Sequence, residues 1–240
     1  MKRILIILVI VLSAVRVVAQ EGSTSGNQGV GKPVEQATSG FIAIDVDGSI
    51  KLRLIPIPDD VAPYIIYDIK GNDPSKFSVD VDRNRVLKIR ERHDAKRVGI
   101  TEVEVYFNRL EEISISKAET TVAGVLYYKM MDISVSNGAT FQAKIDIMDL
   151  KISVSGDSYV VLEGEALYHN ADVSAAKYNA ADLVTMSSIV ESCHNSEVYV
   201  DAEQRLEAKS TTGGKIFYKS TPEILRVEKS LFGVDPVLSK

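Results

Sequence analysis

The sequence predicts an all-β protein built on a parallel β-helix, a solenoid with coils of about 19 residues, preceded by an antiparallel β-sheet region. The first observation is a repeated serine. Ser136, Ser155, Ser174, Ser192 and Ser210 follow one another at this spacing, with the last two intervals one position shorter than the first two. In each copy a β-rich run precedes the serine, and small residues and a second β-rich run follow it.

The second observation is that like residues recur when the copies are aligned at the same spacing. One column reads Ala143, Leu162, Ala181 and Val200, and the neighbouring columns are mostly charged. Alternation with period two across stacked copies is typical of strands that bury one face. We therefore expect the apolar columns to line a shared interior, with successive coils about 4.8 Å apart.

The first residues have the features of a secretory signal. The segment from Met1 to Ala19 begins with two basic residues and an apolar run, and Val17 and Ala19 take the positions before the expected cleavage site. The run is shorter than the roughly 20 apolar residues of a membrane helix, and an uncleaved anchor is the alternative. Residues 20–39 are rich in Gly, Ser and Thr and predict a flexible linker. We expect export to the periplasm, outer surface or extracellular space, with no transmembrane segment in the mature chain.

Charge and cysteine content narrow the possible partners and the means of stabilisation. The chain has 28 Lys and Arg against 33 Asp and Glu, a net charge of −5. That balance disfavours nucleic acid and anionic lipid as partners. Cys193 is the single cysteine, so stability comes from packing and not from an intramolecular disulfide.

Residues 40–109 predict an N-terminal β-sheet region packed on the solenoid. Alternating apolar residues on both sides of Asp47 and Gly48 predict a hairpin over residues 41–55. Further strands are expected from Tyr64, Lys76, Arg85 and Thr101. An antiparallel sheet here would cover the first strand edge of the solenoid, which is expected over residues 110–240.

The candidate site residues are three carboxylates that recur with the period of the repeat. Glu163, Asp182 and Asp201 should stack on the outer wall, where Lys144 and Lys219 can partly neutralise them. A solvated face is the main interpretation. A calcium site and a catalytic carboxylate group are the alternatives.

A second candidate is a pair of tyrosines. Tyr159 and Tyr178 are separated by one repeat and could stack as a platform for sugar rings, or simply stabilise the coils. His93, His169 and His194 have no metal-ligand spacing, which indicates surface or corner residues. The sequence contains no nucleophile elbow, phosphate loop or dinucleotide fingerprint, so we expect no catalytic residues, no metal and no cofactor.

Several segments together resemble a family of secreted bacterial proteins, the putative auto-transporter adhesins with a head GIN domain. They are "GFIAIDVDGSIKL", "VLKIRE", "VYFNRLEEISIS", the corners "SNGA" and "SGDS", and "GGKIFYKSTPE". The resemblance spans about residues 39–235. It implies a right-handed parallel β-helix with an adjoining β-sheet region, exported beyond the inner membrane.

The expected function is a noncatalytic, exported, adhesin-like binding module that presents a β-helix surface to glycan or protein. The alternatives are a structural protein of the cell envelope and a polysaccharide-active enzyme. Strand edges at the ends of the solenoid make a homo-oligomer possible.

Overall fold

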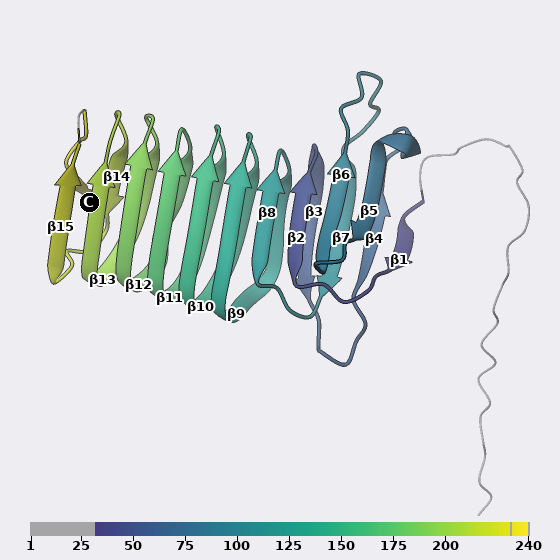
Figure 1. Ribbon diagram of the computed structural model, residues 1–240, viewed down its shortest axis with the longest axis horizontal. Coiled ribbons are helices and arrows are strands. Elements are labelled where there is room, and N and C mark those ends of the chain that lie inside the picture. Colours follow the sequence, from purple (N-terminus) through teal and green to yellow (C-terminus); the bar gives the residue numbers. More distant parts are fainter. Residues whose placement is uncertain (1–31, 231, 240) are drawn as a thin grey trace, which may run out of the picture.

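The strands form one coiled sheet, and the chain is a β-solenoid of about 7 turns, as the repeat predicts (Figure 1). The structure is a computed structural model that describes residues 32–230 and 232–239. The predicted signal at residues 1–19 lies outside the described residues, and so does most of the expected linker.

Five long strands make the regular part of the solenoid. They are β9 (Glu119–Ser136), β10 (Thr140–Ser155), β11 (Tyr159–Ser174), β12 (Lys177–Cys193) and β13 (Glu197–Ser210). Each descends one wall, bends at the lower edge of Figure 1, and ascends the other wall. Each pairs in parallel with the next, so that Phe141 lies opposite Val160, and Ser155 opposite Ser174. The serines therefore stand at the upper corners.

The predicted hairpin over residues 41–55 is wrong. Its two strands, β2 (Ala43–Asp47) and β3 (Ile50–Pro56), do not pair with each other. Instead, β2 pairs in parallel with β6 (Val86–Glu91) and β8 (Glu112–Ser116), while β3 pairs with β7 (Thr101–Phe107) and β9. The alternation of apolar residues fits a hairpin and a solenoid corner equally well, because the same side chains are buried in both.

Gly48 makes this corner possible. It has a φ of 152°, and a Cβ added there would lie 2.7 Å from the Cβ of Glu91. A side chain at this position would therefore collide with the neighbouring coil. The corner sends β3 to the opposite wall from β2, and both strands direct their apolar residues into the interior.

Antiparallel pairing is confined to the outermost strands at the N-terminal end. Here β1 (Val34–Ala37) pairs with β4 (Tyr64–Asp68), which pairs with β7, and β5 (Phe77–Val81) pairs with β6. The short 3-10 helix η1 (Pro74–Lys76) precedes β5. Strand β1 falls within residues 20–39, so the expected linker is not flexible coil throughout. The four strands predicted from Tyr64, Lys76, Arg85 and Thr101 are all present.

The order of the N-terminal coils differs from their order in sequence. The strands β2 and β3 lie between β6 and β7 on one side and β8 and β9 on the other. Parallel pairs therefore cross the expected division between residues 109 and 110, which stays a prediction.

The last coil is short. It consists of β14 (Lys215–Tyr218) on one wall and β15 (Ile224–Lys229) on the other, and β16 (Val237–Leu238) pairs with the outer edge of β14. Ile224, Leu225 and Val227 of β15 are exposed. Whether this end pairs with a second copy remains a prediction.

The interior is a continuous apolar column, but one of the expected core positions shifts by one place in the chain. In the column that contains Leu162 and Val200, the buried residue of β12 is Ala180, and Ala181 is only half-buried. A register irregularity between Val161 and Glu163 accounts for the difference.

The serine ladder shifts in the same way. Ser174 lies opposite Cys193, whereas Ser192 lies opposite Val173 in a buried column. Cys193 is half-buried and takes the corner position that spacing had given to Ser192.

Candidate functional site

The predicted acidic column is partly present on the outer wall. Glu163 and Asp182 lie directly opposite each other on β11 and β12. The ammonium of Lys144 lies 3.2 Å from Glu163, and that of Lys219 lies 2.9 Å from Asp182. Contact with Asp182 raises the pKa of Lys219. The lysines therefore neutralise this pair as expected.

The prediction for Asp201, the third member of the column, is wrong. It lies opposite Val184, because β12 contains a second irregularity between Ala180 and Val184. Its side chain is buried, and one carboxylate oxygen accepts no hydrogen bond. Among residues 32–230 and 232–239, no three His, Cys, Asp or Glu side chains are grouped closely enough to hold a metal ion.

The predicted tyrosine platform does not form. Tyr159 is exposed and lies opposite Lys177, whereas Tyr178 lies opposite Val160 and is fully buried. The coil from Val160 to Tyr178 is one position shorter than the regular repeat, and such a slip sends a strand side chain to the other face. The two tyrosines therefore point to opposite faces of the wall and do not stack.

Tyr178 belongs to a buried polar chain that sequence reasoning missed. His169 is buried, contrary to the expectation that it lies at the surface. Its Nε2 is 2.9 Å from the Tyr178 hydroxyl, and its Nδ1 is 3.1 Å from the Ser188 hydroxyl. Ser188 is bonded in turn to Thr185 at 2.7 Å. Because the coils enclose all four residues, a substrate cannot reach this chain, and its role is structural.

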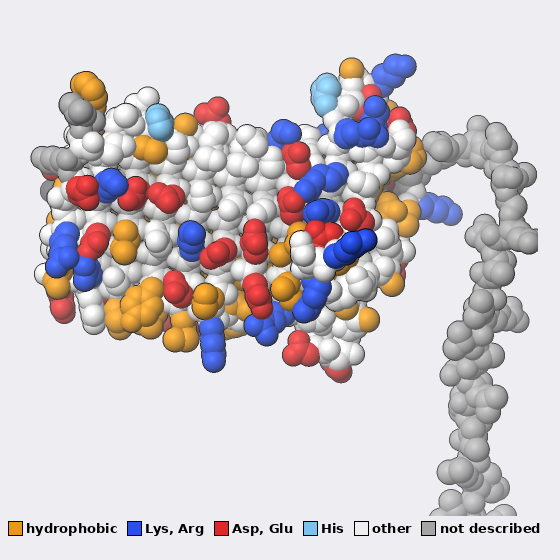
Figure 2. Space-filling view, in the orientation of Figure 1, with side chains coloured by type: hydrophobic (Ala, Val, Ile, Leu, Met, Phe, Trp, Pro, Cys, Tyr) orange, Lys and Arg blue, Asp and Glu red, His pale blue; other side chains and the backbone are white. Residues whose placement is uncertain are grey.

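The strongest surface feature is a line of exposed apolar side chains at the bends opposite the serine corners. We name it the lower-corner surface, and its residues are Tyr127, Met130, Met148, Tyr168 and Met186. Tyr127 and Met130 are each 69% exposed. Asp149 lies opposite both Met130 and Tyr168, which are therefore two coils apart. Figure 2 shows hydrophobic side chains along this lower edge.

Carboxylates accompany these apolar residues. Asp146, Glu165 and Glu203 line a hollow of about 350 Å³ together with Met148 and Met186. Among the described residues, none of the three carboxylates lies within ion-pair distance of a basic side chain. The hollow thus combines flexible thioethers with uncompensated negative charge.

A second concave region lies at the N-terminal end of the same edge. Tyr127 and Met130 line an open cavity of about 900 Å³ with Asp59, Arg109 and Glu111. The lower-corner surface therefore runs from this cavity across β9 to β12. Sequence reasoning overlooked it because it treated only the serine corners as bends and read the residues between them as straight strands.

The family described as "putative auto-transporter adhesin, head GIN domain" matches residues 40–222. Among solved structures, a putative adhesin from Bacteroides fragilis is similar with a TM-score of 0.75 and 18% identity over 86% of this chain and 95% of its own. A putative adhesin from Parabacteroides merdae has a TM-score of 0.70 and 16% identity, and the match covers 88% of this chain and 97% of that protein.

A protein from Parabacteroides distasonis described as a putative lipid binding protein has a TM-score of 0.67 and 18% identity, with 88% and 98% covered. These likenesses show a shared fold. No curated protein matches the sequence. Within the described residues, the structure contains no helix able to span a membrane.

Proposed function

Because the chain belongs to the family of putative auto-transporter adhesins with a head GIN domain, we propose that it is a noncatalytic, exported binding module whose lower-corner surface binds a partner polypeptide. The observation that carries the proposal is the line of exposed Met and Tyr side chains across four stacked coils. Clustered exposed apolar residues mark interaction sites in soluble proteins.

The chemistry of this surface favours a polypeptide over a glycan. Methionine adapts its shape to varied apolar partners, and Met and Tyr are enriched at protein interfaces. Tyr127 and Tyr168 lie two coils apart, with Asp146 and Asp149 in the coil between them. That arrangement offers sugar rings no continuous aromatic platform.

The unpaired carboxylates specify the partner further. Asp146, Glu165 and Glu203 would attract basic side chains, and complementary charge mainly increases association rate and specificity. We therefore expect the partner segment to combine apolar residues with Lys or Arg. Glycan binding and a purely structural role in the cell envelope are the alternatives.

Parallel peptide and glycan arrays test the proposal. The wild-type chain should bind peptides that carry both apolar and basic residues, and less strongly as salt is raised. Replacing Met130, Met148 and Met186 together by Ser should weaken this binding about tenfold or more. Tyr159→Ser is the control, because Tyr159 is exposed at an upper corner.

The other results would each contradict the proposal. Glycan binding that survives the triple substitution would mean that the protein binds glycan through a surface other than the lower-corner surface. Absence of binding to both arrays would favour the envelope role. External protease treatment of whole cells is the separate test of surface exposure, since a chain on the outer surface should be cleaved.

A further inference from the structure

The upper edge at the N-terminal end carries a protruding loop with two exposed apolar side chains. Residues 92–100 join β6 to β7 and project beyond the row of upper corners (Figure 1). Val98 and Ile100 are 78% and 59% exposed. Neither packs on the core, so the loop displays two branched aliphatic side chains to solvent.

The loop is held in place by a buried amide. The side-chain oxygen of Asn72 accepts hydrogen bonds from the backbone N–H groups of Val98 and Gly99, at 2.9 and 3.2 Å. Its nitrogen donates to the Gly99 carbonyl at 2.9 Å and to the Thr101 hydroxyl at 3.2 Å. The backbone that carries Val98 is therefore fixed by specific contacts, which keeps the ordering entropy of a docked state small.

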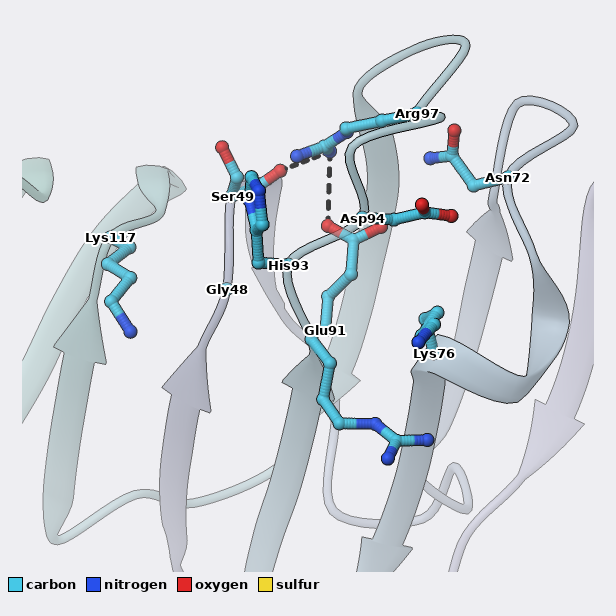
Figure 3. A pocket seen from close by; sticks show the side chains of 10 residues that line it. Gly48, Ser49, Asn72, Lys76, Glu91, His93, Asp94, Arg97 and Lys117 are labelled. Carbon is cyan, nitrogen blue, oxygen red and sulfur yellow. Dashed lines mark hydrogen bonds and ion pairs between the residues drawn. The ribbon is translucent and has the colours of Figure 1, made fainter.

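Arg97 fastens the loop to the neighbouring coil. Its guanidinium donates to the Ser49 carbonyl and lies 3.1 Å from the buried carboxylate of Glu91 (Figure 3). Thr101 donates its hydroxyl to the other oxygen of Glu91. The negative charge of Glu91 is thus compensated within the protein.

A basic pocket lies beside the loop. Its volume is about 550 Å³, and its charged lining comprises Lys76, Arg92, Arg97 and Lys117 against Glu91 and Asp94. Lys117 pairs with Asp47 at 2.9 Å. Among the described residues, Lys76 and Arg92 have no carboxylate within ion-pair distance, and the Arg92 guanidinium donates a hydrogen bond to the Ser75 carbonyl. These two cations therefore lack a direct ion pair; beyond ion-pair distance, both interact electrostatically with Asp73.

Charge is distributed unevenly along the chain, which the overall balance conceals. Residues 70–100 contain nine Lys and Arg against five Asp and Glu, whereas the whole chain has 28 against 33. The acidic balance of the sequence disfavoured anionic lipid as a partner. Locally, however, the loop and pocket combine net positive charge with two exposed apolar side chains.

We propose that this loop and pocket dock the protein on a lipid surface that carries anionic phosphate headgroups. Val98 and Ile100 enter the boundary between headgroups and acyl chains, and Lys76 and Arg92 bind a headgroup phosphate in the pocket behind them. Apolar burial and attraction to anionic lipid are the two terms that hold peripheral proteins on membranes. The lower-corner surface lies on the opposite edge (Figure 1), so docking would leave it facing away from the bilayer.

Vesicle cosedimentation tests this proposal independently of the polypeptide-binding function. The full chain should sediment with mixed phosphatidylglycerol–phosphatidylcholine vesicles and much less with phosphatidylcholine alone. Val98→Ser with Ile100→Ser, and separately Lys76→Glu with Arg92→Glu, should each reduce the partition about tenfold or more. All variants share the same N-terminal residues, so binding by that segment contributes an equal background.

The matched controls change the same chemistry elsewhere. Met130→Ser with Met148→Ser removes apolar side chains from the opposite edge, and Lys129→Glu with Lys151→Glu reverses exposed charges on the regular coils. Both should retain vesicle binding. Equal loss in these controls, or equal partition of wild type and both loop variants, would overturn the proposal. The proposal would also be overturned if the chain bound inorganic phosphate but not the vesicles, since the ligand of the pocket would then be a free anion. Thermal unfolding of each variant checks that it is folded.

Discussion

The hydroxyl of Tyr178 lies 2.9 Å from Nε2 of His169, and both side chains are enclosed by the coils of the solenoid. Burial lowers the pKa of His169 from 6.5 to about 4 and raises that of Tyr178, because the interior disfavours the charged form of either group. The pair is therefore neutral in the folded protein and bonds as two neutral groups.

The first prediction concerns acid stability. Because the folded pKa of His169 is depressed, the unfolded chain binds this proton first as pH falls. The contribution of His169 is fully present above pH 6.5 and is lost between pH 6.5 and about 4, to a total of about 3 kcal/mol. Urea unfolding at a series of pH values measures this loss. His169→Gln should flatten the slope in that window and His93→Gln should not; equal slopes in all three proteins would refute the assignment.

The second prediction separates the two tyrosines of the expected platform. Tyr178→Phe leaves Nε2 of His169 without its buried partner and should cost about 2 kcal/mol. Tyr159→Phe, at an exposed site, should change stability by less than about 0.5 kcal/mol. Denaturant midpoints of the two variants provide the comparison. Similar effects would restore the original interpretation, in which both tyrosines face solvent.

The third prediction concerns Gly164, which lies between Ile145 and Leu183 in the stacked coils. Its φ is 116°, and an added Cβ would lie 2.1 Å from the Ile145 carbonyl oxygen. Gly164→Ala should therefore destabilise the protein by about 3 kcal/mol or more. Gly138→Ala is the control: its φ is also positive, at 76°, but it has open space around it, so it should cost only about 1 kcal/mol. Thermal unfolding distinguishes them, and equal losses would mean that the coils are farther apart at Gly164.

The fourth prediction tests the shifted serine ladder. Cys193 occupies a half-buried corner opposite Ser174, so Cys193→Ser should change the free energy of unfolding by less than about 0.5 kcal/mol. Ser192 is buried, and its hydroxyl is 2.8 Å from that of Ser196. Ser192→Ala should therefore cost about 1 kcal/mol, since it leaves Ser196 with one bond fewer. The reverse order of the two effects would show that Ser192, and not Cys193, continues the ladder.

Of the candidate site residues, spacing located Glu163 and Asp182 correctly relative to each other and to their lysines. It misplaced Asp201 and Tyr178, as well as the expected core residue Ala181; all three lie in β12 or beyond it. A fixed period cannot reveal which coil is shorter or longer than the others by a single position. Once the register slips, each later side chain is assigned to the wrong partner or the wrong face.

By itself, the sequence determined that this protein is a β-solenoid with a regular repeat, because alternation and repetition are local properties that any stacked neighbour must satisfy. Only the tertiary structure decided that β2 and β3 lie on opposite walls, that the lower bends display Met and Tyr, and that a buried amide fixes a projecting basic and apolar loop. These features depend on contacts between residues far apart in the chain. The alternating side chains of a strand fit many possible partner strands. The pairing is therefore decided by the strands that the tertiary structure places next to it.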